Sequence, residues 1–163
     1  MATLFLKADE LVIGSKGSVF FTINKIREEI AGIQKIEAHK SISGTTFATV
    51  GTITKQQRIT GIGGVGSLTG NYWMIKKFRK MLEEYEKSGV FPEWAIMIIN
   101  DNVGATLGSN VVQLFGCQLT GDVPIAMLDA TTDDGLTVGI AFSFQSSENL
   151  EEFSDPQRVG REG

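Results

Sequence analysis

Hydrophobic positions in this chain fall mostly in short runs or in alternation with polar ones, a pattern typical of β-strands. Val19–Ile23 is a run of aromatic and β-branched residues, and Ile30–Ile42 alternates over its second half. Thr45–Thr54 is again rich in Thr, Val, Ile and Phe, and Ser43-Gly44 separates it from the preceding run. We therefore expect residues 30–54 to form a long two-stranded arm that turns at Ser43-Gly44.

More runs of strand-forming residues follow. Gln56–Ile62 leads into a glycine-dense stretch, Gly61–Gly70, which we expect to continue as strand. The predicted strands beyond this stretch are Trp94–Ile99, Val111–Leu119, Ile125–Leu128 and Leu136–Gln145. Together with the earlier runs, the pattern predicts about seven short strands.

One segment has helical periodicity instead. Apolar residues recur there at spacings of three and four, at Met74, Ile75, Phe78, Met81, Leu82 and Tyr85. Asn71 is a candidate N-cap, and Gly89 with Pro92 ends the predicted helix. Its basic residues come early and its acidic residues late, against the helix macrodipole. Packing of the apolar face must therefore hold this helix, or a partner must cover its charges.

These elements predict a mainly β fold with one α-helix, built as a β-sandwich or barrel. An α/β fold is disfavoured because helices do not alternate with strands. The length of 163 residues predicts a single domain, which we assign to residues 1–153. Residues 154–163 are polar, and we expect them to form a C-terminal tail.

Composition narrows the function. The formal net charge is −4, which is too acidic for a general polyanion binder. A single cysteine and a single histidine exclude an intrachain disulfide and a multi-histidine zinc site within one chain. We see no signal peptide and no apolar run of roughly 20 residues, so we expect a soluble protein made in a reducing cytoplasm.

The charges are unevenly distributed along the chain. Residues 1–99 hold 13 basic and 9 acidic side chains, whereas residues 100–163 hold 2 basic and 10 acidic ones. A basic first part and an acidic second part suit a subunit that docks one surface onto a different surface of its neighbour.

The glycine-dense stretch imitates a phosphate-binding loop between a strand and a helix. However, no Gly-Lys-Ser/Thr sequence follows it, and the acidic residues Glu83 and Glu84 lie inside the predicted helix rather than at a strand end. We therefore favour a strand that needs close backbone approach, a bulge or a bend.

Other candidate sites have simpler explanations. His39 shares a strand face with Glu37 and Ser41, but no nucleophile motif accompanies them, so we expect a solvated or interface histidine. The acidic residues 129–134 depart from EF-hand spacing, and we expect an acidic surface turn. The basic residues 76–80 of the helix are expected on a solvated face, and Cys117 in the core.

The order and spacing of motifs along nearly the whole chain carry a family resemblance. The motifs are Ser15–Phe20, Ile36–Ala38, Lys55–Thr60 leading into the glycine-dense stretch and Tyr72, the single helix, Leu119–Pro124, and Phe142–Phe144 with a tail through Phe153 and Pro156. The opening Lys16-Gly17 and the turn Gly121–Pro124 are the most characteristic. This succession resembles the tail tube proteins of contractile-tailed phages, phage-like elements and diffocin-like R-type bacteriocins of Gram-positive hosts.

The resemblance implies a structural protein with no catalysed reaction and no cofactor or metal. Subunits would close into hexameric rings that stack into a hollow tube. The implied partners are other copies of the chain, a sheath protein, baseplate and tape-measure proteins, and DNA only as passing cargo. Assembly would take place in the host bacterial cytoplasm, in a virion or released bacteriocin particle, without stable membrane association before injection.

The resemblance also directs attention to contacts between subunits. We expect the arm 30–54 to bridge one ring to the next, and neighbouring strands to complete a continuous inner barrel. The expected contact residues are Phe47, Val50, Ile53, Lys55, Arg58, Gly63, Gly64 and Gly66, with the glycines close to a neighbour's backbone. Two other functions stay open: a tail terminator or baseplate-hub component of the same fold, and a phosphate-binding enzyme domain that uses Gly61–Gly70.

Overall fold

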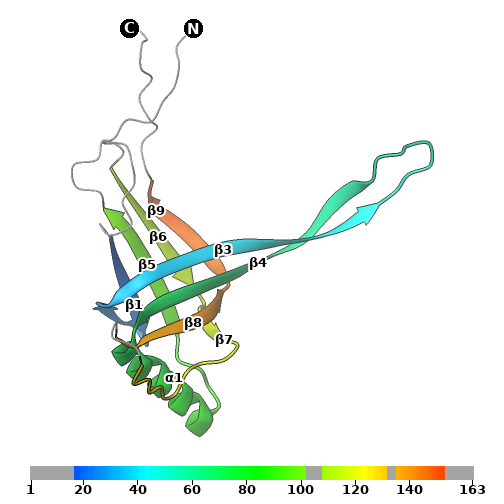
Figure 1. The fold of residues 1–163 in the computed structure, drawn as a ribbon. Helices are drawn as coiled ribbons and strands as arrows, with labels where there is room; N and C mark the ends of the chain where they lie inside the picture. The colour runs from blue at the N-terminus through cyan, green and yellow to red at the C-terminus, as the bar shows by residue number, and fades with distance from the viewer. Residues whose placement is uncertain (1–16, 102–107, 132–134, 153–163) are drawn as a thin grey trace, which may run out of the picture.

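The computed structural model describes residues 17–101, 108–131 and 135–152, which form two antiparallel sheets and one α-helix (Figure 1). The first sheet has five strands in the order β2-β1-β5-β6-β9. Its strands are β1 (Gly17–Ile23), β2 (Ile26–Glu29), β5 (Trp94–Asp101), β6 (Ser109–Phe115) and β9 (Ser146–Glu151). The mainly β fold with one helix is therefore confirmed.

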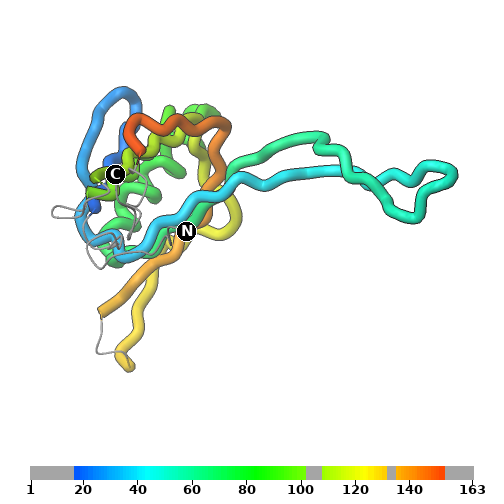
Figure 2. The backbone as a smooth tube through the Cα atoms, turned by 90° about the horizontal axis from the view of Figure 1, so that it is seen from above, coloured from blue at the N-terminus to red at the C-terminus, as the bar shows by residue number. Residues whose placement is uncertain are grey.

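The second sheet has four strands in the order β3-β4-β8-β7. They are β3 (Ile33–Phe47), β4 (Gln56–Asn71), β7 (Gln118–Thr120) and β8 (Thr137–Phe144). β3 and β4 have 15 and 16 residues, and they extend well beyond the rest of the sheet as a hairpin arm (Figures 1 and 2).

Aromatic side chains hold the two sheets and the helix together. Trp94 on β5 lies at the centre, with Phe21, Phe78 and Phe142 at centroid distances of 5.4, 5.9 and 5.9 Å in edge-on geometry. All four are almost fully buried, and they come from both sheets and the helix. Such edge-to-face pairs stabilise a core beyond their burial alone.

The helical segment lies across one end of the sheets (Figure 1). A 3₁₀ turn, η2 (Tyr72–Met74), precedes α1 (Ile75–Ser88). The buried residues of α1 are on the predicted apolar stripe, and Gly89 ends it with a φ of 74°, the left-handed conformation that glycine tolerates. Asn71 precedes the 3₁₀ turn without capping it through its side chain, so its predicted role as helix cap is wrong.

The predicted arm exists, but its turn and second strand were misplaced. β3 continues through Ser43 and Gly44 with only a bulge, and its partner is β4. Residues 48–55, which include most of the predicted second strand Thr45–Thr54, form the turn instead. A bulge inserts one residue without ending a strand, which explains why a serine–glycine pair failed as a turn signal.

Two other strand predictions need correction, and the edge strands β2 and β9 were not predicted. Val111–Leu119 is divided into β6 and β7 at Gly116, whose φ is 64°. Ile125–Leu128 is not a strand in the structure. β9 was missed because this edge strand is polar and largely exposed, so it carries no hydrophobic signal.

Some predictions fall outside the described residues. These are the Lys16 half of the opening motif, Asp133, Asp134 and the proposed tail 154–163. The assignment of residues 1–153 to one domain also stays a prediction.

Candidate interaction surfaces

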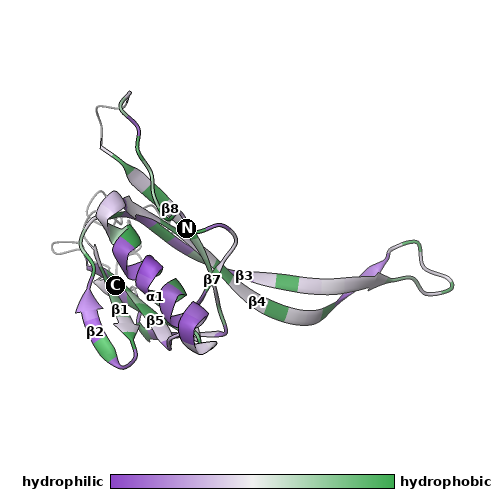
Figure 3. Ribbon diagram, turned by 90° about the horizontal axis from the view of Figure 1, so that it is seen from below, coloured by the Kyte–Doolittle hydropathy of each residue, from purple (hydrophilic) through white to green (hydrophobic). Residues whose placement is uncertain are grey.

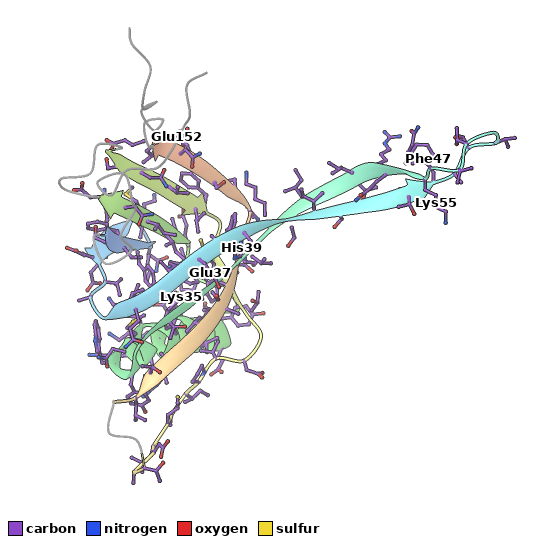
Figure 4. The ribbon with its side chains drawn as sticks, turned by 45° about the horizontal axis from the view of Figure 1, so that its top comes forward. Lys35, Glu37, His39, Phe47, Lys55 and Glu152 are labelled. Atoms are coloured by element: carbon purple, nitrogen blue, oxygen red, sulfur yellow. The ribbon has the colours of Figure 1, made fainter. Side chains whose placement is uncertain are left out.

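The hairpin arm brings most of the predicted contact residues together. Phe47 is the last residue of β3 and pairs with Gln56, while Arg58 on β4 pairs with Thr45. Figure 4 shows Phe47 and Lys55 near the far end of the arm, away from the sheets. The arm therefore presents these side chains to solvent rather than to the protein's own core.

The turn at the end of the arm is well defined and carries two bare hydrophobic side chains. The hydroxyls of Thr49 and Thr52 are 2.7 Å apart, the backbone N–H of Thr52 donates to the carbonyl of Thr49, and Gly51 has a φ of 88°. Val50 and Ile53 are fully exposed on this turn. Nothing in the described chain covers them.

The apolar face of the second sheet also continues out along the arm. On this face Ile36 is opposite Leu68 within the body, and Ile42 is opposite Ile62 farther out. Leu68 is buried, whereas Ile42 and Ile62 are 61% and 65% exposed. The same face is thus core in one half of the hairpin and bare in the other, which is typical of a surface that a partner covers.

The glycine-dense stretch forms part of β4, as the favoured interpretation predicted. A Cβ at Gly64 would lie 2.5 Å from the ring of Phe144, and one at Gly66 would overlap the ring of Phe142. The close neighbours of these two glycines are therefore the chain's own phenylalanine rings, together with adjacent backbone. Gly61 and Gly63 have no atom within 4 Å of such a Cβ, so their expected contact with a neighbour stays a prediction.

The phosphate-loop interpretation is wrong. Gly61–Gly70 pairs with β3 along its length, and from Gly64 onward also with β8, so its backbone amides take part in ladders. The α-helix begins only at Ile75, after a 3₁₀ turn. No loop presents converging amides to an anion at these residues, which is what such a site needs.

A row of polar side chains lies on the opposite face of the second sheet, where Figure 4 shows Lys35, Glu37 and His39 along β3. The carboxylate of Glu37 is 3.7 Å from Lys35 Nζ and 3.5 Å from His39 Nε2, and it accepts a hydrogen bond of 3.4 Å from Ser67 Oγ. Ser41 pairs with Gly63 in the ladder. His39 is largely exposed, so it is a solvated histidine in this chain, and an interface role stays a prediction.

The basic residues at the start of α1 do more than face solvent. Lys77 Nζ lies 2.5 Å from a carboxylate oxygen of Glu28, and Arg79 donates to the carbonyl of Ile125 at 2.9 Å. Figure 3 shows the hydrophilic outer face of α1. These charges therefore tie the helix to the β2 region and to the segment that follows β7.

The remaining candidates are structural. The Asp129 carboxylate accepts bonds from the backbone and hydroxyl of Thr131, which lowers the pKa of Asp129 and forms a surface turn. Among the described residues no group of histidine, cysteine and acidic side chains could hold a metal ion. Cys117 is buried in the core as predicted, and burial raises the pKa of its thiol to about 12.

Two hollows mark the surface of the body. The larger, about 410 Å³, lies between the start of β1, the end of β5 and residues 29–36, and the smaller, about 290 Å³, lies between α1 and the β1–β2 turn. Ser18, Glu29 and Lys35 are among the residues that line the larger hollow, and in the described part of the chain no hydrogen bond joins these three side chains.

Sequence reasoning missed one exposed apolar segment. Ile125 and Leu128 are 62% and 96% exposed, and Met127 is 39% exposed. The hydrophobicity of Ile125–Leu128 predicted a strand instead. The signal that could have corrected this is the short spacing between Gly121, Pro124 and Asp129, which favours a turn-rich connection.

Comparisons with known proteins agree with this architecture. A family model described as phage tail tube protein matches residues 4–151. A search of curated protein sequences gives no match. In the described part of the chain, no helix has the length and hydrophobicity needed to cross a membrane.

Solved structures of contractile particles show similar folds. A chain in the cap that terminates the tube of the anti-feeding prophage has a TM-score of 0.63 at 11% identity, covering 90% of this chain and 94% of that one. A chain in the anti-feeding prophage baseplate gives 0.59 at 14%, covering 92% and 97%. A chain in the extended PVC sheath-tube complex, an extracellular contractile injection system, gives 0.59 at 13%, covering 87% and 93%.

Proposed function

Because this chain belongs to the phage tail tube protein family, we propose that it is the structural subunit of the inner tube of a contractile injection apparatus. In this role copies close into hexameric rings, and the rings stack into a hollow conduit. The role is structural, with no reaction and no cofactor. The apparatus is a phage tail or a phage-tail-like bacteriocin.

The hairpin arm is the observation that carries this proposal. It extends away from the core with Ile42 and Ile62 exposed on its apolar face, and with Val50 and Ile53 bare at its tip. In an isolated monomer the backbone ladder alone holds this part of the arm, because these side chains have no cover. Burial of these side chains against the next ring would stabilise a stack by about 25 cal/mol for each Å² of apolar area removed from water.

The second sheet offers a way to close each ring. It ends in β3 on one side and β7 on the other, so its two edges are different surfaces. A contact between different patches of identical subunits generates a ring when the rotation closes. In the proposed ring, neighbouring second sheets therefore join edge to edge into a continuous inner barrel.

The other proposed partners follow from this role. A sheath protein surrounds the tube, baseplate and tape-measure proteins contact it during assembly, and DNA passes through it if the particle is a phage. In the polar row along β3 the carboxylate of Glu37 lies 3.7 Å from Lys35 Nζ, so an acidic side chain offsets positive charge there. Such an offset weakens the retention of a polyanion. Assembly is proposed in the host bacterial cytoplasm, before release within a virion or bacteriocin particle, without stable membrane association before injection.

Negative-stain electron microscopy of the purified chain tests this function. The expected result is concentration-dependent growth of uniform hollow filaments, because one surface is open at each end of a stack. A chain that stays monomeric at millimolar concentration, even when its sheath protein is added, would contradict the proposal.

A tube terminator or baseplate-hub role is the second candidate, since the compared tube-terminating cap and baseplate chains share the fold. Both roles predict rings, but a terminator forms single rings that do not grow. The same micrographs therefore separate the two roles.

A further inference from the structure

The segment Ile125–Leu128 combines a strand-like sequence with no strand in the structure. It follows β7, which pairs with β8 only over Gln118–Thr120, and Gly121 with a φ of 66° then turns the chain away. In Figure 2 the yellow trace that includes this segment runs outward beside the start of β8. It is therefore an extended segment at the edge of the second sheet.

Two hydrogen bonds hold one side of this segment against its own chain. The carbonyl of Ile125 accepts from Arg79 at 2.9 Å, and the backbone N–H of Met127 donates to the Tyr72 hydroxyl at 3.1 Å. Residues 125 and 127 thus direct their backbone groups inward, toward the helical segment.

The other side of the segment is open. In an extended chain, successive residues direct their N–H and C=O groups to opposite sides, so those of Ala126 and Leu128 point outward. Within the described part of the chain, these outward groups have no hydrogen-bond partner. Side chains at both Ile125 and Leu128 are exposed as well. The segment therefore has the properties of an edge strand that lacks its partner.

Resting on the proposed tube function, we propose that Ile125–Leu128 becomes a β-strand on assembly, by pairing with the free edge of β3 in the neighbouring copy of this chain. β3 is the opposite edge of the same sheet, and its outer side is unpaired in the sheet. A pairing between two different edges satisfies the requirement for ring closure. The hydrogen bonds at Ile125 and Met127 already fix the segment in the free subunit, with its unpaired backbone groups facing outward. Pairing with a neighbour therefore costs less conformational entropy.

Charge supports this choice of partner. The segment is flanked by Asp122 and Asp129, and the sequence has no basic residue between positions 101 and 157. β3 carries Lys35 and Lys40, and Glu37 is its only acidic residue. A copy offering the acidic segment thus meets a predominantly basic edge, which fixes the direction of the contact.

Hydrogen exchange on the full chain tests the pairing directly. The amides of Ala126 and Leu128 should exchange rapidly in the free subunit and about 100-fold or more slowly in tubes, because pairing protects outward amides. Equal exchange in both states would overturn the inference. Tubes that grow without this protection would leave the proposed function intact, whereas failure of all assembly would count against the function itself.

A matched pair of variants adds a functional readout. Ala126→Pro removes an outward N–H, and Ala126→Ser keeps it at an equally exposed site. We expect tube growth of Ala126→Pro to need about a tenfold higher protein concentration, with growth of Ala126→Ser unchanged. Equal growth of both variants, with equal thermal midpoints of the free subunits, would contradict the pairing.

Cysteine cross-linking then identifies the partner edge. Leu128→Cys is combined in turn with Lys40→Cys, Ser41→Cys, Ile42→Cys and Ser43→Cys, while the buried Cys117 does not react. Oxidised tubes should give a ladder of linked subunits for at least one pair, since a disulfide needs Cβ atoms about 3.5–4.5 Å apart. Leu128→Cys alone is the control and should give no ladder. If no double variant gives a ladder either, residues 40–43 of β3 are not the partner of the segment.

Discussion

At the scale of single residues, the contrast among the glycines of β4 shows how one residue type serves two purposes. Gly64 and Gly66 leave room for the rings of Phe144 and Phe142, which fill the core between the sheets. Gly61 and Gly63 are open and extended, so the isolated chain gives no steric reason for glycine there. Identical residues a few positions apart therefore differ in their effect on stability.

The substitution Gly66→Ala should destabilise the subunit by about 1–3 kcal/mol, because the added methyl group overlaps the buried ring of Phe142. Gly61→Ala is the matched control on the same strand, with nothing within 4 Å of its new methyl group. Thermal or urea unfolding of the free subunit measures both. Equal stability of the two variants would show that the ring can move aside without cost.

Cys117 predicts a chemical and a pH effect. Burial raises the pKa of its thiol to about 12 from 9.0, so the folded chain should react with a maleimide only through unfolding. At a pH between these two pKa values, the thiol is deprotonated in the unfolded chain and protonated in the folded chain. The free energy of unfolding should therefore fall as pH rises above 9. Cys117→Ala should lessen this fall in unfolding titrations. Rapid labelling of the native protein would contradict the buried thiol.

At the scale of elements, the arm shows how a strand can leave its core while keeping its ladder. β3 and β4 stay paired from Ile33 to Phe47, so the backbone bonds remain satisfied far from the body. Their side chains, in contrast, lose their cover once the hairpin passes the core. The arm is consequently stable as a ladder and incomplete as a hydrophobic surface.

Phe47→Asp should leave a folded, soluble subunit that no longer forms tubes. Phe47 lies outside the hydrophobic core, so its replacement should shift the thermal midpoint little. In the proposed stack, however, a carboxylate would be buried without a partner, which is costly. Phe47→Leu is the control and should assemble. Unimpaired tubes of Phe47→Asp under the electron microscope would remove the arm end from the contact.

At the scale of the whole molecule, the basic and the acidic parts of the sequence supply different candidate contact surfaces. The arm and β3 belong to the basic first part of the chain, while the Ile125–Leu128 segment and β9 belong to the acidic second part. Copies arranged around a ring or along a stack can then meet with opposite signs. Such complementarity favours correct docking more than it strengthens the final contact.

Tube growth should therefore slow as ionic strength rises. The screening length falls from about 10 Å at 0.1 M salt to about 3 Å at 1 M, which weakens attraction between exposed charges. Light scattering during assembly measures the rate over this range. Because apolar burial does not weaken in the same way, preformed tubes should persist. A growth rate independent of salt would show that the charge division has no role in docking.

Much of this molecule could be predicted from the local sequence. Strand-forming runs, one amphipathic helix ending at Gly89, a buried Cys117 and a strand through the glycine-dense stretch all follow from propensities and spacing. These features depend on residues that are close in the sequence. Their effect on secondary structure does not depend on where the segment lies in the fold. The contact residues Phe47, Val50 and Ile53 came from the family resemblance instead; the structure leaves them exposed on the arm, and their role in contacts stays a prediction.

The pairing of strands was decided only by the tertiary structure. β3 continues past Ser43 and Gly44 to Phe47 and pairs with β4. The run Thr45–Thr54 has strong β propensity throughout, yet only its first three residues are in a strand. The polar β9 pairs with β6, while the hydrophobic Ile125–Leu128 has no strand partner among the residues that the structure describes. A ladder is chosen by long-range packing, here of Phe142 and Phe144 against β4, and no local pattern contains that information.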